Sequence, residues 1–251
     1  MKDFYRVLSA EALKLRRTLA LRLAVVTPLT IVILVFGIYA QRHETMSSGA
    51  NPLTGFAQLI LTMWTIILLP LYAALAAALL ASIEHQGDNW TRLLALPVDR
   101  GFIYAAKWIA GIALLLVSSL VLPAGVCAAA EALRVIKPGW GALALPTTMI
   151  FKGAILSFCA AGLLFSIQMW ISLRWRSFLP GLVVAAVALI LMFLSARGGG
   201  ALFASIFPWS LPAMAMAPSS PHRVLAVTWG VVGGAAVSAI ACFLLSRHEF
   251  K

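Results

Sequence analysis

The stretch SIEHQGDNWTRLLALPVDR, residues 82–100, separates two long apolar runs at 56–83 and 102–133. A helix crosses the roughly 30 Å of bilayer hydrocarbon in about 20 residues, so each run is long enough to cross. The polar stretch between them must lie outside the hydrocarbon. It also contains the apolar step Leu-Leu-Ala-Leu-Pro at 93–97, which a passive connector does not need. We therefore interpret residues 84–101 as a short loop that contains a docking helix.

The composition predicts an integral membrane protein. The chain has 251 residues, of which 62% are hydrophobic and 11% charged. A soluble domain has about half apolar and a quarter charged residues. A membrane β-barrel would need alternating polar and apolar positions, whereas runs such as 182–194 are continuously apolar. We expect an all-α fold.

Six stretches are long and apolar enough to be transmembrane helices, and we expect one multi-pass domain over residues 1–251. Pro70 lies inside the second stretch and predicts an irregularity there, because proline has no N–H to donate. The expected spans are 23–40, 56–83, 102–133, 149–173, 178–195 and 224–245.

The N-terminal segment, residues 1–19, reads as an amphipathic interfacial helix. Apolar residues recur at helical spacing at Phe4, Leu8 and Leu15. Such a helix would lie in the membrane surface with its basic side chains toward lipid phosphates. A cleaved signal peptide is the alternative, but its basic region would be unusually long. The expected membrane-surface anchors are Arg6, Lys14, Arg16 and Arg17.

The net charge of +11 sets the expected topology. Most of the 19 Lys and Arg residues fall on one side of the membrane if the N-terminus is cytoplasmic, as the positive-inside rule requires. Both termini and the 84–101 loop are then cytoplasmic. Because the bases flank apolar spans, we assign them to anionic headgroups and expect no nucleic-acid partner.

Residues 196–221 are irregular. Three glycines open the segment and four prolines punctuate it, and its apolar pieces are too short to cross. We expect a re-entrant or interfacial segment on the extracytoplasmic side.

No motif for catalysis, phosphate binding or metal binding is present, so we expect no enzyme activity and no cofactor bound by this chain. Cys127, Cys159 and Cys242 lack metal-ligand spacing and read as small buried residues. Glu131 and Gln168 are candidates for lining a pathway, because polar groups within spans are costly and often functional. For Glu131, pairing with Arg134 is the favoured alternative.

Small residues recur every fourth position in the last span, at Gly230, Gly234, Ser238, Cys242 and Ser246. Such a stripe lets another helix approach closely. We favour packing within the chain over a dimer interface.

The loop resembles the cytoplasmic coupling segment of type-2 ABC transporter permeases. The resemblance rests on Glu84 at the end of a span, a short helix over 88–96, Pro97, Arg100 and then Lys107 at the start of the next span. The opening EALKLRR at 11–17 is similar to that family's N-terminal helix. The sequence Leu-Pro-Val-Asp-Arg at 96–100 most resembles the sequences of one branch of the family. That branch exports, or gives immunity to, antimicrobial peptides and includes the lantibiotic-immunity permeases.

The resemblance implies a function. The chain would be the permease half of an ATP-driven exporter in the bacterial inner membrane, paired with a second permease subunit. A separate ATP-binding subunit would bind ATP and Mg and dock on the loop. The residues implied in docking are Glu84, Asp88, Trp90, Arg92, Leu93, Leu94, Leu96, Pro97, Arg100 and Lys107.

Two other functions remain open on the sequence. An ATP-independent transporter or channel should carry charged groups deep in its spans, and only Glu131 and Lys152 come near this. A scaffold subunit of a membrane complex would need no ATP-binding partner.

Overall fold

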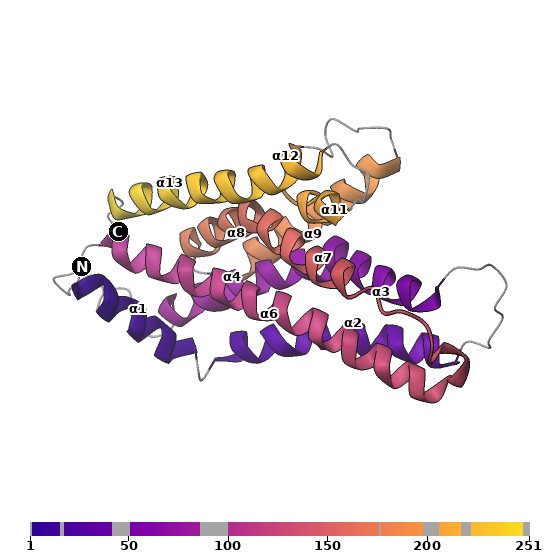
Figure 1. Cartoon of the computed structure of the whole chain (residues 1–251). Coiled ribbons are helices and arrows are strands. Elements are labelled where there is room, and N and C mark those ends of the chain that lie inside the picture. The colour runs from indigo at the N-terminus through magenta and orange to yellow at the C-terminus, as the bar shows by residue number, and fades with distance from the viewer. Residues whose placement is uncertain are drawn as a thin grey trace.

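The structure is a computed structural model that describes residues 2–15, 18–41, 51–85, 100–175, 177–197, 206–216 and 222–247. These residues are helical, with short connections and no strand, which confirms the predicted fold class for this part of the chain (Figure 1). In chain order the elements are α1 Lys2–Leu15, α2 Leu19–Gln41, α3 Pro52–Met63, η1 Trp64–Leu68, α4 Leu69–His85, α6 Arg100–Ile136, η3 Pro138–Trp140, α7 Thr147–Ala160, α8 Gly162–Arg174, α9 Leu179–Arg197, α11 Leu211–Met216, α12 Arg223–Thr228, η4 Trp229–Gly233 and α13 Gly234–Arg247.

Within the described residues, four continuous helical stretches are long and apolar enough to cross a membrane: 19–41, 52–83, 101–136 and 223–244. The pair α7 and α8 makes a fifth if it is taken as one span, and α9 is a shorter apolar helix. A multi-pass membrane protein is therefore confirmed, and the exact number of spans stays a prediction.

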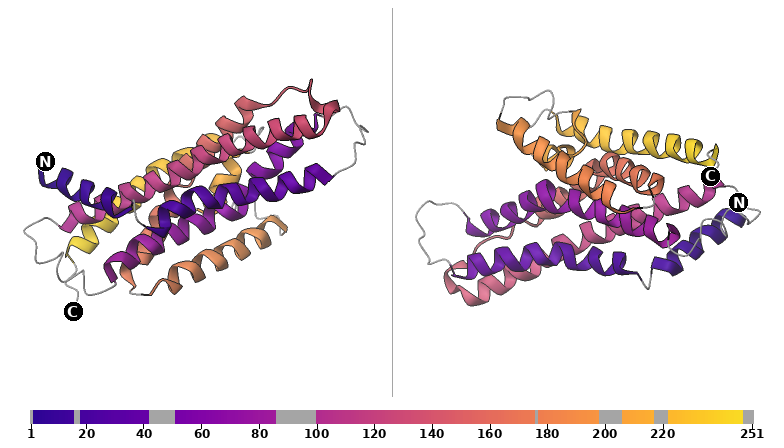
Figure 2. Two further views of the ribbon diagram at one scale, coloured as in Figure 1. Left: turned by 90° about the horizontal axis from the view of Figure 1, so that it is seen from below. Right: turned by 180° about the vertical axis from the view of Figure 1, so that it is seen from behind.

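The helices form an elongated bundle with two distinct ends (Figures 1 and 2). One end, the termini end, holds α1, the last turns of α4 and α13, and the first turns of α6 and α2. The other, the opposite end, holds the last turns of α2 and α6 and the first turns of α3 and α7. The first and last described residues, Lys2 and Arg247, thus lie at the same end of the bundle.

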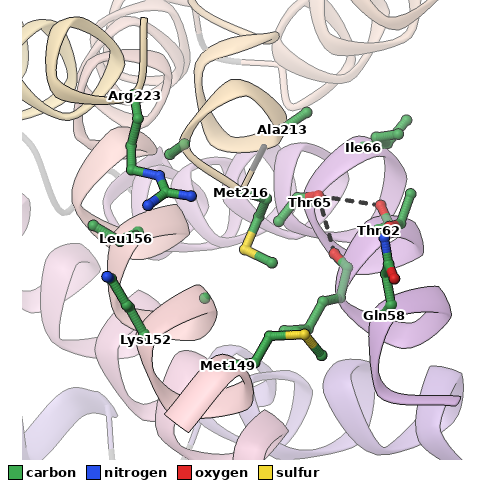
Figure 3. Close-up of a pocket in the computed structure, with 13 residues that line it drawn as sticks. Gln58, Thr62, Thr65, Ile66, Met149, Lys152, Leu156, Ala213, Met216 and Arg223 are labelled. Atoms are coloured by element: carbon green, nitrogen blue, oxygen red, sulfur yellow. Dashed lines mark hydrogen bonds between the residues drawn. The ribbon is translucent and has the colours of Figure 1, made fainter. Parts of the chain in front are cut away.

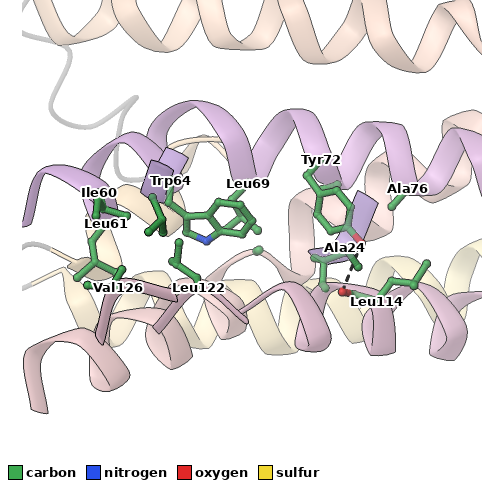
Figure 4. Packing of buried hydrophobic residues seen from close by; sticks show 14 of the residues in the cluster. Ala24, Ile60, Leu61, Trp64, Leu69, Tyr72, Ala76, Leu114, Leu122 and Val126 are labelled. Atoms are coloured by element: carbon green, nitrogen blue, oxygen red, sulfur yellow. Dashed lines mark hydrogen bonds between the residues drawn. The ribbon is translucent and has the colours of Figure 1, made fainter. Parts of the chain in front are cut away.

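The core lies where α3, η1 and α4 face α6 and α2 (Figure 4). Trp64 and Tyr72 are buried there beside Leu114 and Leu122 of α6. The Tyr72 hydroxyl donates a hydrogen bond of 3.4 Å to the Leu114 carbonyl. Apolar packing and this bond hold the second and third spans together along the middle of the bundle.

The irregularity expected at Pro70 is a π-helical turn. It covers Trp64–Leu68 and ends just before the proline. Pro70 has no N–H for the carbonyl four residues earlier, and a wider turn relieves the clash of its ring with that carbonyl. The Thr65 hydroxyl donates within this turn, at 2.9 Å from the Leu61 carbonyl and 3.1 Å from that of Thr62.

The expected span over 149–173 consists of two helices, α7 and α8. The helix breaks at Ala161, and α7 and α8 meet at 43°. At the break, Gly162 faces Gly230 so closely that a Cβ on Gly162 would lie 2.6 Å from the Gly230 carbonyl oxygen. The last span therefore crosses the bend in backbone-to-backbone contact.

Two members of the small-residue stripe account for this crossing. A Cβ on Gly230 would lie 2.4 Å from the Ala160 Cα, and one on Gly234 would lie 2.7 Å from the Gly162 carbonyl carbon. The Ser166 hydroxyl oxygen lies 2.9 Å from the Gly234 carbonyl oxygen, to which it donates. Gly230 and Gly234 thus pack within the chain, which confirms the favoured interpretation for these two positions.

Of residues 196–221, the structure describes the end of α9 and residues 206–216. In this part α11 packs against α7 and α12 near the opposite end. Whether the segment is re-entrant or interfacial stays a prediction.

Candidate functional site

The predicted docking segment joins two helices at the termini end. Helix α4 ends at His85 and α6 begins at Arg100, and both of these helix ends lie at this end of the bundle. Of the predicted contacts, Glu84 and Arg100 lie in these helices, and their side chains are not described. Asp88, Trp90, Arg92, Leu93, Leu94, Leu96 and Pro97 lie outside the described residues.

Helix α1 packs against the first turns of α6, directly beside the start of that helix at Arg100. Its inner face carries Phe4, Leu8 and Leu15, which are partly buried, whereas Tyr5 and Leu13 are exposed. The rings of Phe4 and Phe102 meet edge to face with centroids 5.6 Å apart. The predicted amphipathic pattern therefore serves a helix–helix contact on at least part of its apolar face.

An acid and a base are buried at the centre of this contact. The Lys107 side chain is fully buried, and its Nζ lies 3.2 Å from Oε2 of Glu11, whose side chain is 3% exposed. The other carboxylate oxygen of Glu11 lies 2.9 Å from Nζ of Lys14. One carboxylate on α1 therefore faces two ammonium groups, one on its own helix and one on α6.

The position of Lys107 explains why it needs an acid. It lies seven residues into α6, about 10 Å along the helix axis at the rise of an α-helix. Removing an ammonium group from water is costly unless a counter-charge and hydrogen bonds replace the water. Glu11 supplies that counter-charge across the α1–α6 contact, so the attachment of α1 and the burial of Lys107 depend on each other.

This pair was not predicted as a pair. Lys107 was assigned to an ATP-binding partner, and in the structure its side chain is buried within the chain, so its role toward a partner stays a prediction. Glu11 was noted only as part of the N-terminal pattern. The sequence does contain a signal for the pair. Glu11 falls at helical spacing on the apolar face of the amphipathic helix, and an acid at such a position requires a buried partner.

The predicted membrane anchors differ in how exposed their side chains are. Arg6 is exposed on the outer face of α1, and Lys14 is half-buried beside Glu11. Arg16 and Arg17 lie outside the described residues. Contact of these bases with lipid stays a prediction.

The two candidate pathway residues have contrasting surroundings. Glu131 lies at the opposite end and forms an ion pair of 2.7 Å with Arg134, which also donates to the Leu143 carbonyl. The Glu131 side chain is 58% exposed, which fits the favoured pairing interpretation.

Gln168, in contrast, is fully buried on α8, and neither its amide nitrogen nor its amide oxygen has a hydrogen-bond partner among the described residues. Beside it lies Gly181 of α9, where a Cβ would be 3.0 Å from the Ser172 hydroxyl oxygen and 3.6 Å from the Gln168 amide oxygen. Gly181 therefore lets α9 approach two buried polar side chains. A role of Gln168 in a pathway stays a prediction.

No metal centre is found within the described ranges, where no three His, Cys, Asp or Glu side chains gather closely enough to hold an ion. The three cysteines are free thiols of intermediate exposure in the spans.

The comparisons with known proteins identify a family. Residues 7–195 match the model of the ABC-2 family transporter proteins, and because this range covers most of the sequence, the chain belongs to that family. Searches of curated proteins and of solved structures found no match.

Proposed function

We propose that this ABC-2 family chain is the permease subunit of an ATP-driven exporter in the bacterial cytoplasmic membrane. It crosses the membrane six times with both termini in the cytoplasm and forms half of the translocation path together with a second permease subunit. The single observation that carries the proposal is the family match over residues 7–195. Both termini lie at one end of the bundle, which supports the topology.

Two separate ATP-binding subunits dock on the 84–101 loops of the two permeases. ATP and Mg are bound by those subunits, since this sequence lacks a phosphate-binding loop. Leu93, Leu94 and Leu96 enter an apolar groove of the partner as interface anchors. Charged neighbours in the loop set the orientation of the docked subunit.

The α1–α6 contact supports a route by which ATP-driven motion enters the membrane. The docking loop continues directly into α6, and α1 is joined to the same part of α6 by the buried pair of Glu11 and Lys107. A displacement of the loop therefore moves the start of α6 and α1 together. The core contact of Tyr72 with Leu114 then links α6 to α4, on the other side of the loop.

The proposed substrate is an antimicrobial peptide or another amphipathic, lipid-like molecule. The resemblance of the docking loop to the immunity branch supports this choice. The many large apolar side chains exposed on the outer faces of α9 and α13 fit a bundle surrounded by lipid and a second subunit.

The test is co-purification with the ATP-binding protein encoded beside this chain, with and without Leu94→Asp. We expect a stable complex with ATPase activity from the unaltered chain, and loss of the complex with Leu94→Asp. Val135→Asp is the matched control, since Val135 is 82% exposed at the opposite end, and this variant should still form the complex. Failure of a folded, unaltered chain to bind any ATP-binding protein would reject the proposal in favour of an ATP-independent channel or a scaffold.

A further inference from the structure

A cavity of about 400 Å³ opens near the opposite end of the bundle, away from the docking loop. Four parts of the chain line it: the second span around η1, helix α7, helix α11 and the start of α12. Nothing in the proposed transport cycle described so far uses it. Its size falls within the range of small-molecule binding sites.

Two cationic side chains lie on one side of this cavity. Lys152 comes from the second turn of α7, and Arg223 is the first residue of α12. Figure 3 shows them along the same wall, with Gln58, Thr62 and Thr65 of the second span on the facing wall. Segments far apart in the sequence thus bring two positive charges together opposite a row of amide and hydroxyl groups.

The lining contains no carboxylate. None of its described residues is Asp or Glu. Glu131, the acid described near this end of the bundle, is already in an ion pair with Arg134. An anionic group in the cavity would be attracted by both cations of this wall.

The rest of the lining is apolar and adaptable. Met149 and Met216 project between the two polar walls (Figure 3). Methionine is flexible and polarisable, so it packs against ligands of varied shape. The cavity therefore combines charge for an anionic group with an apolar surface for a hydrocarbon part.

We propose that this cavity binds the phosphate group of an amphipathic molecule, with Lys152 and Arg223 as its ligands. The Arg223 guanidinium suits two oxygens of one phosphate, and the Lys152 ammonium acts as a point charge. The hydrocarbon part lies against Met149, Met216 and Ile66.

The same chemistry can reach the cavity from two sources: a phospholipid of the surrounding leaflet or a soluble phosphate ester. Binding at this cavity requires this chain alone. It does not depend on an ATP-binding partner, so it can stand or fall independently of the transport function proposed above.

The experiment measures binding to the purified full chain in a neutral detergent by isothermal titration calorimetry. The probes are dihexanoyl phosphatidic acid, inorganic phosphate, and dihexanoyl phosphatidylcholine, which has the same chains but no net charge. We expect phosphatidic acid to bind and phosphatidylcholine to bind much more weakly. Binding should also weaken as salt is added, because the interaction is between charges.

The decisive variant is Lys152→Gln with Arg223→Gln. Hydrogen bonds to charged groups are among the stronger ones, so the loss of both cations should weaken phosphatidic acid binding by at least about tenfold. The matched control is Arg22→Gln with Arg174→Gln, which removes two exposed cations from the termini end. This control should bind as the unaltered chain does, because generic attraction to basic side chains is not the mechanism.

A second variant covers the case in which the charge variant does not fold. Ala213→Leu keeps both cations and adds volume to the lining, and it should also weaken binding. The proposal is overturned if the folded charge variant binds phosphatidic acid as tightly as the unaltered chain, or if phosphatidylcholine binds equally well. If inorganic phosphate competes fully at similar concentration, the phosphate site is supported and the source is a soluble ester rather than a lipid.

Discussion

The two ends of the bundle differ in what surrounds their charged side chains. At the termini end, the carboxylate of Glu11 neutralises a fully buried ammonium group, that of Lys107, across a contact between two helices. At the opposite end, Lys152 and Arg223 line an open cavity whose lining has no acid. Each arrangement brings distant segments together, but the first buries an ion pair between two helices and the second lines a cavity of about 400 Å³.

The difference separates a structural use of charge from a binding use. A buried base with an internal counter-charge holds helices in place and cannot bind anything else without being released. Bases that line a cavity retain access to a ligand. On this basis the termini end is suited to the proposed transmission of motion from the 84–101 loop, and the opposite end to the proposed binding of a molecule.

The largest expected effect follows from breaking the buried pair. Lys107→Met leaves the Glu11 carboxylate buried beside an apolar side chain, with only Lys14 of its known partners remaining. Loss of one partner of a buried pair costs about 3–5 kcal/mol. We expect a corresponding drop in the free energy of unfolding, measured by chemical denaturation of the purified chain in mixed micelles.

The double variant Glu11→Leu with Lys107→Met is the control for this experiment. Replacing a whole buried pair by apolar side chains is often nearly neutral, so most of the lost stability should return. If the double variant were as unstable as Lys107→Met alone, the two side chains would not depend on each other as described.

An intermediate effect is expected between the two ends, where the last span crosses the bend of α7 and α8. Gly230→Ala places a methyl group where a Cβ would lie 2.4 Å from the Ala160 Cα. Backbone cannot move aside as a flexible side chain can, and overpacking costs about 1–3 kcal/mol. The unfolding free energy, measured in the same way, should fall by that amount.

Gly37→Ala is the matched substitution, because a Cβ on Gly37 of α2 meets nothing within 4 Å. It should be neutral or stabilise by up to about 1 kcal/mol, since alanine is the better helix former. If Gly230→Ala and Gly37→Ala lowered the free energy of unfolding equally, the last span would pack less closely against α7 and α8 than it does in the structure.

The smallest effect is expected at the exposed pair of the opposite end. Glu131→Gln removes the ion pair with Arg134 but keeps the bond that Arg134 donates to the Leu143 carbonyl. Exposed pairs contribute about 0–1 kcal/mol. The free energy of unfolding should change by less than about 1 kcal/mol. A loss as large as that of Lys107→Met would mean that the ion pairs at the two ends contribute equally to stability.

The helical class and most of the spans could be predicted because hydropathy is a local property. A continuous apolar run such as 102–133 needs no knowledge of its neighbours to be recognised as a crossing helix. Pro70 also acts locally, and a π-helical turn does precede it. The span over 149–173 could be predicted in the same way, but its bend at Ala161 could not, because the bend depends on the close approach of the last span to Gly162.

The two charge clusters could not be found by the same reasoning. Glu11 and Lys107 are 96 residues apart, and although the position of Glu11 indicates a buried partner, nothing in the sequence says which base that partner is. Lys152 is recognisable in the sequence only as a charge near a span, and Arg223 precedes the last expected span without any motif around it. Their common cavity depends on how α7, α11 and α12 pack, which no periodicity in the sequence specifies.

By itself, the sequence determined that this protein is a helical membrane protein with a polar loop between two spans that resembles the coupling segment of ABC permeases, because apolar length and short motifs act within one segment. Only the tertiary structure decided which distant segments meet: the acid of α1 with the base of α6, the glycines of the last span with the bend between α7 and α8, and the cations of α7 and α12 with one cavity. These contacts depend on the close approach of separate helices, where burial makes each unpaired charge and each added methyl group costly.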